Sequence, residues 1–198
     1  MAKDPREEAR RAQARSDAEA LKEREARLAA AQAPKPRLVK GLSKSKEKTL
    51  AEIIREAYPD GIVNEQSDDG NSVELKLEEN GPSFALKYDP EKGEIDLNSP
   101  NATPLEIYQV GIKLSLKAFA ARFELIGPPE EEKFIISAFR EILHNGTPED
   151  KVALEKMINQ NKVKANGKYV GFDKGELVLK DNPSRKIKMS PPSDPSSS

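Results

Sequence analysis

Apolar and polar residues alternate along the middle of the chain in a way that predicts an antiparallel sheet. Between residues 72 and 79, valine and leucine alternate with charged or polar residues, which is the period of a strand with one buried face. The turn Asn80-Gly81 connects this run to a second one at 83–88, and a third run follows at 94–97. The pattern predicts a three-stranded antiparallel meander.

Helical spacing of apolar residues predicts four helices beside this meander. Two of them begin at Thr103-Pro104 and Thr147-Pro148, where a capping side chain precedes a proline that suits the first helical turn. The expected elements are a helix through Leu50 and Ala57 capped by Ser43 or Ser45, helices from Thr103 to Arg122, Glu130 to His144 and Thr147 to Asn161, a strand at 123–126 and a terminal hairpin of 168–172 and 176–179. The predicted fold class is α/β (α+β), with packed helices in one small domain.

The two ends of the chain carry too few apolar residues to form a core. Residues 4–32 are mostly helix-forming and charged, and only Leu21 and Leu28 are large and apolar, so we expect a free helical arm with one coiled-coil step. The Ser- and Pro-rich C-terminus has nothing to bury and is expected to be disordered. The predicted organisation is a charged helical arm and basic linker at 1–42, a folded domain at 43–182 and a tail at 183–198.

Composition limits the chemistry that the chain can offer. The 198 residues contain no cysteine and one histidine, which leaves no thiolate nucleophile and no common zinc site. The single histidine, His144, lies in the last turn of a predicted helix, where the helix dipole favours a capping role over a catalytic one. No apolar run approaches the ~18 residues of a membrane span, and the N-terminus lacks the apolar stretch of a signal peptide. We expect a cytoplasmic protein without catalytic residues, cofactor or metal. A carboxylate-based hydrolase is the enzymatic alternative, and it would need a buried carboxylate with a raised pKa.

Positive charge is concentrated in two regions, although the formal net charge of the chain is only -1. One region is the basic linker, and the other is a cluster just before the C-terminal tail, made of Lys180, Arg185, Lys186 and Lys188. Lysines also decorate the end of the last helix and the terminal hairpin. Such clusters attract phosphates and acidic partners, although they also keep linkers solvated. The candidate residues for binding nucleic acid or an acidic partner are Lys35, Arg37, Lys40, Lys44, Lys46, Lys48, Lys162, Lys164, Lys168 and Lys174.

The last third of the chain places helix, tight turn, helix and hairpin in the order of a winged helix. In such a module one helix enters the major groove of DNA while hairpin lysines contact phosphates. The last helix, however, mixes Glu149, Asp150 and Glu155 with lysines and has no arginine to read guanine. Ordinary solvation of a hairpin is the competing interpretation of these lysines.

Two segments resemble a known module, namely Asp96-Leu-Asn-Ser-Pro-Asn-Ala-Thr-Pro104 and Ile112-Lys-Leu-Ser-Leu-Lys-Ala-Phe-Ala-Ala-Arg-Phe-Glu-Leu-Ile-Gly127. The module is found beside relaxases and other large polyvalent proteins of conjugative elements, and the similarity rests on apolar spacing over about a third of the chain. Such modules also occur in proteins tied to type IV secretion, and the hydrophilic Ser-rich tail is similar to a translocation signal. The resemblance implies a setting and carries over no site residue.

These features together favour a non-enzymatic interaction module or adaptor. Its core would present a surface to a protein partner, while the basic arm tethers or extends it. The resemblance implies a component or substrate of a type IV secretion or conjugation assembly. The alternative is an accessory nucleic-acid-binding protein that uses the basic linker and the winged-helix-like part, and a steep salt dependence of binding would support it because each phosphate contact releases counterions.

Overall fold

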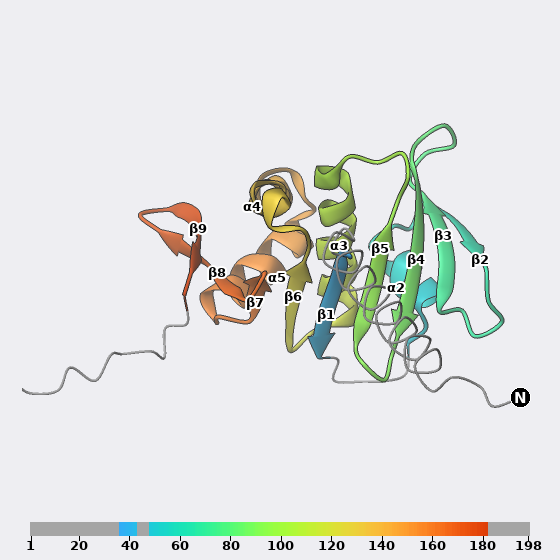
Figure 1. The fold of residues 1–198 in the computed structure, drawn as a ribbon, viewed down its shortest axis with the longest axis horizontal. Helices are drawn as coiled ribbons and strands as arrows, with labels where there is room; N and C mark the ends of the chain where they lie inside the picture. Colours follow the sequence, from blue (N-terminus) through green and yellow to red (C-terminus); the bar gives the residue numbers. More distant parts are fainter. Residues whose placement is uncertain (1–35, 43–47, 182–198) are drawn as a thin grey trace, which may run out of the picture. The chain divides into compact units, whose positions relative to one another are not determined.

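A mixed β-sheet with helices on one side forms the fold (Figure 1). The computed structural model describes residues 36–42 and 48–181. In chain order the elements are β1 (Leu38–Leu42), α2 (Leu50–Ala57), β2 (Ile62–Glu65), β3 (Ser72–Lys76), β4 (Ser83–Asp89), β5 (Glu94–Asn98), α3 (Pro104–Ala118), β6 (Arg122–Ile126), the 3-10 turn η1 (Pro129–Glu131), α4 (Glu132–Asn145), α5 (Pro148–Asn159), β7 (Val163–Ala165), β8 (Lys168–Asp173) and β9 (Glu176–Lys180). The arm predicted at 4–32 and the tail predicted at 183–198 lie outside the described residues.

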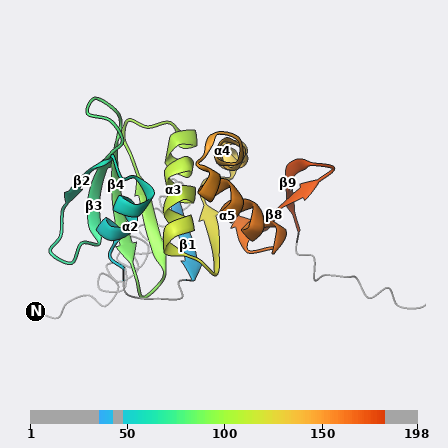
Figure 2. The same ribbon diagram turned by 180° about the vertical axis from the view of Figure 1, so that it is seen from behind.

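The strand order of the sheet is β2-β3-β4-β5-β1-β6-β7-β8-β9. All neighbouring strands are antiparallel except β6 and β7, which are parallel and are connected through η1, α4 and α5. The first strand of the chain, β1, lies between β5 and β6 and therefore joins the two halves of the sheet. The helices pack on one face of the sheet, where α3 contacts β1, β5 and β6 and the other helices flank it (Figure 2).

The helices begin where the sequence supplies side-chain caps. Thr103 and Glu106 form a reciprocal capping box at the start of α3, in which the Thr103 backbone N–H donates to the Glu106 carboxylate over 2.7 Å. A second capping box opens α2, and its cap is Thr49 rather than the expected Ser43 or Ser45. The central helix α3 ends at Ala118 instead of reaching Arg122, because the chain turns there and Arg122 already belongs to β6.

The core lies between the helices and the face of the sheet that they cover. Alternate strand residues point into it, as the sequence period predicts for Val73 and Leu75 of β3. Phe119, which follows α3, is fully buried and packs against Gly41 of β1 so closely that a Cβ at Gly41 would lie 2.3 Å from its ring. A bulky residue at position 41 would therefore push α3 away from the central strand.

The structure confirms the predicted α/β class and extends the predicted sheet. The meander is β3-β4-β5 and the terminal hairpin is β8-β9, and both belong to one sheet rather than to separate units. The expected boundary at residue 43 is too late, because residues 38–42 form the central strand β1 and not part of a linker. No described helix is long and apolar enough to span a bilayer.

Candidate functional site

One face of the sheet is covered by helices, and no described element packs on the other, which we call the open face. Strand alternation decides which side chains reach it. The register places Lys40 of β1 opposite Glu124 of β6, and Glu124 opposite Lys164 of β7. The same row continues through Tyr169 of β8 to Lys180 of β9. Ionisable and aromatic side chains from five neighbouring strands therefore lie side by side on the open face.

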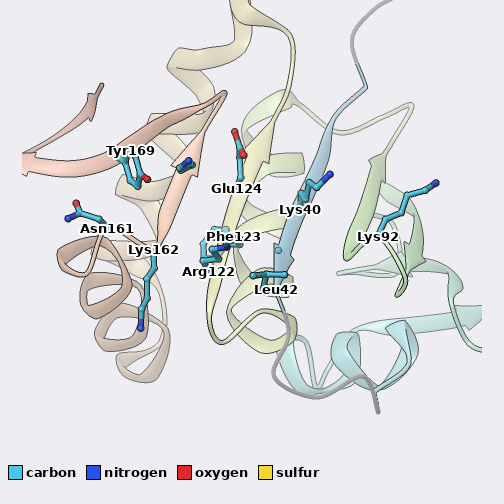
Figure 3. A pocket seen from close by; sticks show the side chains of 11 residues that line it. Lys40, Leu42, Lys92, Arg122, Phe123, Glu124, Asn161, Lys162 and Tyr169 are labelled. Carbon is cyan, nitrogen blue, oxygen red and sulfur yellow. The ribbon is translucent and has the colours of Figure 1, made fainter. Parts of the chain in front are cut away.

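A cavity of about 310 Å³ opens near the beginnings of β6 and β7, and we call it the basic cavity (Figure 3). Its charged lining consists of five cations and a single carboxylate, so the site carries an excess of positive charge. The lining residues are Lys40, Gly41, Leu42, Lys92, Arg122, Phe123, Glu124, Asn161, Lys162, Lys164 and Tyr169. A concave surface with this excess of cations attracts anions, since its walls focus the field of the charges.

Local backbone structure brings Lys92 to the cavity from the turn between β4 and β5. Gly93 in that turn adopts a φ of +66°, which favours glycine, and its carbonyl accepts a 2.8 Å hydrogen bond from the Gly41 backbone N–H. A Cβ at Gly93 would lie 2.3 Å from the Gly41 carbonyl oxygen. Only glycine lets the turn approach β1 this closely, and the approach places Lys92 beside the cavity.

Two other cations, Arg122 and Lys162, reach the cavity from the beginnings of strands. Arg122 opens β6 opposite Leu42. Lys162 lies in the reversal between α5 and β7, where Asn161 has a left-handed φ of 54° and the Lys162 backbone N–H donates to Met157 over 3.0 Å. The Lys162 carbonyl in turn accepts from the Phe123 backbone N–H over 3.0 Å, which aligns the beginnings of the two parallel strands.

The cavity cations differ in how far other side chains neutralise them. Lys40 pairs with Glu94 over 2.8 Å and Lys92 pairs with Asp89 over 3.2 Å. Within residues 36–42 and 48–181, Arg122, Lys162 and Lys164 form no ion pair with any acidic side chain. Among the described residues, no carboxylate therefore neutralises these three cations through a direct ion pair.

A hydrogen bond restrains the carboxylate of the cavity, and a cation–π contact restrains its aromatic ring. The Glu124 carboxylate accepts a 2.6 Å hydrogen bond from the Gly167 backbone N–H, so part of its hydrogen-bonding capacity is used within the fold. The Lys164 ammonium lies 4.5 Å from the centroid of the Tyr169 ring, in cation–π contact. Tyr169 is half-buried and lines the same cavity as the three cations without an ion pair.

Helix dipoles account for only part of this charge. Arg122 and Lys162 follow the C-termini of α3 and α5, where positive charge is favoured with or without a ligand. Lys40, Lys92 and Lys164 lie on strands or in a strand turn and have no such helix end beside them in the chain. Lys40 and Lys92 instead have carboxylate partners and Lys164 has the Tyr169 ring, so each of these cations has a neighbour within the fold.

The structure separates the cations that the sequence analysis grouped together. Lys40, Lys162 and Lys164 meet at the basic cavity, whereas Arg37, Lys48 and Lys168 pair with Glu131, Glu56 and Glu132 at 2.5, 2.6 and 3.2 Å, and Lys174 occupies the tip of the β8-β9 hairpin with a φ of 50°. Lys35, Lys44 and Lys46 lie outside the described residues. The predicted order of helix, turn, helix and hairpin is present as α4, α5 and β8-β9, with α5 packed against α4 and β8, and β7, β8 and β9 continue the sheet.

Arg37 belongs to a second polar site, which we call the buried ion pair. Its guanidinium donates to both Glu131 carboxylate oxygens, over 2.7 and 2.5 Å, and the fully buried Tyr108 hydroxyl donates to Glu131 over 2.7 Å. The hydrogen bond from Arg37 lowers the pKa of Glu131, although burial opposes it. Glu131 therefore lacks the raised pKa that the carboxylate-hydrolase alternative requires.

Lys92, Arg122 and Tyr169 are among the cavity residues that the sequence did not identify as candidates. Lys92 was assigned only to a turn, Arg122 to the end of a helix and Tyr169 to one strand of a hairpin. Strand alternation within the predicted hairpin could have placed Tyr169 and Lys180 on one face, since both flank the same turn. Arg122 and Lys92 could not be joined to them, because that requires the long-range insertion of β1 between β5 and β6.

Other chemistry is limited among the described residues. No three His, Asp or Glu side chains in this part of the chain gather as a metal site. His144 lies in the last turn of α4, where its Nδ1 is 2.8 Å from the Arg140 carbonyl oxygen. Comparisons with known proteins find no family model, no curated protein and no solved structure that matches this chain.

Proposed function

We propose that this chain is a nucleic-acid-binding module and that its basic cavity binds the phosphate backbone. The observation that supports it is the convergence of five cations on one cavity of the open face, three of them without an ion pair among the described residues. Phosphate contacts of this kind supply most sequence-independent affinity for nucleic acids. This is the alternative that the sequence analysis kept, now with a different site from the winged helix.

The extent of the surface favours a polymer over a single small anion. The row from Lys40 through Lys164 to Lys180 crosses five neighbouring strands. At about 4.8 Å per strand spacing it extends for about 19 Å, which is longer than one phosphate group needs. A flexible polyanion can contact several cations of the row at once, and each contact adds to the affinity.

In the described part of the chain, helix α5 offers no comparable basic surface. Helix α5 buries Leu154, Met157 and Ile158, and its first turn carries Glu149 and Asp150. These two carboxylates approach Lys117 to 3.1 and 3.6 Å, so the helix end is already part of an internal ion-pair network. The open face is therefore the better candidate for nucleic-acid contact than α5.

The remaining expectations of the sequence analysis stay predictions. A protein partner, a cytoplasmic location and a setting in a conjugation or type IV secretion assembly have no support from contacts among the described residues. A non-enzymatic role agrees with the proposal, since binding a phosphate backbone needs no catalytic group. Of these expectations, only the protein partner is an alternative outcome of the binding experiment.

The test compares nucleic-acid binding by two triple variants of the full chain. One changes Arg122, Lys162 and Lys164 to alanine, and the control changes the exposed Lys87, Lys133 and Lys156, which lie outside the basic cavity. Fluorescence anisotropy with a labelled oligonucleotide of mixed sequence measures affinity at several salt concentrations. Both variants keep the same arms and lose the same charge, so the difference between them reports the cavity.

We expect the cavity variant to bind about 10- to 100-fold more weakly than the control and to lose about 2 to 3 units of salt slope, since each phosphate contact contributes close to one unit. Equal affinity and equal slope in the two variants would contradict the proposal. So would binding of anionic vesicles or an acidic peptide by the unmodified chain with no binding of oligonucleotide, because this would assign the cations to a different partner.

A further inference from the structure

The aromatic ring in the basic cavity leads to a more specific ligand class. Tyr169 lines the cavity together with Arg122 and Lys162, so an aromatic ring and cations able to bind phosphate line the same space. Base–aromatic stacking combined with a positively charged groove is how proteins hold single strands without sequence readout. Resting on the proposed function, we infer that the cavity binds single-stranded nucleic acid and that one base stacks on the Tyr169 ring.

The surroundings of Tyr169 keep its ring on the open face. Its cross-strand neighbours are Lys164 on one side and Lys180 on the other. Lys180 extends along the next open-face position, where a Cβ at Gly171 would lie 3.2 Å from its Cδ, and its ammonium donates to the Phe172 carbonyl over 2.5 Å. The Lys164 ammonium lies over the ring, so a base that stacks on that face displaces it. A restrained ring loses little freedom when a base stacks on it.

The size of the cavity and the need for an unpaired base also favour a single strand over a duplex. A cavity of about 310 Å³ is at the lower end of ligand sites, which run from about 300 to 1,000 Å³, and gives room for one base with its phosphate. A duplex keeps its bases paired and stacked inside, so it can offer its phosphates to Arg122 and Lys162 but no base to Tyr169. The inferred ligand is therefore a strand whose bases are free to leave their own stack.

The experiment separates stacking from charge by varying both protein and ligand. Tyr169→Leu removes the ring, while Tyr169→Phe keeps the ring and loses only the hydroxyl. The full chain and both variants are titrated with a labelled single strand, a strand of equal length made entirely of abasic sites, and a duplex of that length. Circular dichroism and thermal unfolding verify that both variants are folded.

We expect Tyr169→Leu to weaken binding of the base-bearing strand by about 5- to 100-fold, which is the range that loss of one base–aromatic stack produces. Its affinity for the abasic strand and its salt slope should stay unchanged, and Tyr169→Phe should bind like the unmodified chain. Equal binding of base-bearing strand, abasic strand and duplex by Tyr169→Leu and the unmodified chain would overturn this inference and leave the proposed function standing. No binding of any of the three ligands by the unmodified chain would remove both.

Discussion

Arg37 and Lys40 lie three residues apart in one basic stretch, yet the fold gives them opposite environments. The Arg37 guanidinium turns into the protein, where 29% of its side chain stays exposed and it holds the 11%-exposed side chain of Glu131. The Lys40 side chain points to the open face, is 53% exposed and lines the basic cavity. A run of positive charge in a sequence therefore does not identify one site, because the pleat of the strand and its place in the sheet distribute the charges.

The comparison also shows how each environment sets the cost of losing a charge. At the buried ion pair, removing one partner leaves the other in a poorly hydrated place, and stability suffers. At the basic cavity the cations are open to solvent, and losing one changes affinity for an anion more than stability. Substitutions in the two regions should accordingly be distinguishable by what they change.

The largest expected effect comes from a core residue that packs against β1, the strand that carries Lys40. Phe119 is fully buried, packs on Gly41 of β1 and meets the ring of Tyr88 edge-on at 6.3 Å between ring centroids. Phe119→Ala should lower the free energy of unfolding by about 3 to 5 kcal/mol, because it leaves a cavity beneath the central strand. Ile135→Ala, at another fully buried position, should cost about 2 to 4 kcal/mol. Urea unfolding measures both, and unchanged midpoints would contradict this description of the core.

A smaller loss is expected at the buried ion pair. Glu131→Gln should lower the free energy of unfolding by about 2 to 3 kcal/mol, somewhat less than for a fully buried pair because Arg37 is partly exposed. Nucleic-acid binding by the folded variant should stay within about 2-fold of the unmodified chain, since no phosphate contact is removed. A large loss of affinity with unchanged stability would contradict this prediction, because it would mean that Glu131 acts on the basic cavity rather than on the fold.

The difference in stability between Glu131→Gln and the unmodified chain should also depend on pH. The folded pKa of Glu131 lies below its ordinary value, so the carboxylate stabilises the fold above the ordinary glutamate pKa of about 4.3, and this stabilisation is lost as pH falls toward the folded pKa. The stability gap between the unmodified chain and Glu131→Gln should therefore be full at neutral pH and shrink below about pH 4. Asp69, Asp89 and Glu106 also have lowered pKa values, but they titrate in both proteins and cancel in the difference.

Much of the fold could be predicted from local patterns. Alternation identified β3, β4 and β5, and the Thr-Pro pairs located the starts of α3 and α5 to the residue. What failed was the placement of β1, whose sequence Leu-Val-Lys-Gly-Leu has a single fully buried side chain, Val39, and a glycine. Its strand character comes from pairing with β5 and β6 and from the fit of Gly41 under Phe119, which are long-range properties that no local period reveals.

The candidate site was predictable only in part for the same reason. Lys40, Lys162 and Lys164 were identified by charge, but their meeting depends on β1 lying beside β6 and on β6 pairing in parallel with β7. Lys162 and Lys168 were equivalent in the sequence and are separated in the structure, because one lies at the basic cavity and the other faces Glu132. The charge pattern identified candidate lysines, but the order of the strands determines which of them lie together.

The smallest expected effects separate the two faces of a single hairpin. Lys164 and Lys168 flank the turn between β7 and β8, but Lys164 reaches the open face while Lys168 lies on the helix side, with its ammonium 3.2 Å from the Glu132 carboxylate. Each change to alanine should cost no more than about 0.5 kcal/mol of stability, because both side chains are partly exposed. Lys164→Ala should weaken oligonucleotide binding by about 2- to 5-fold, and Lys168→Ala should leave it unchanged, since only one of them lines the cavity. Equal losses in the two variants would mean that net charge, rather than the open face, determines binding.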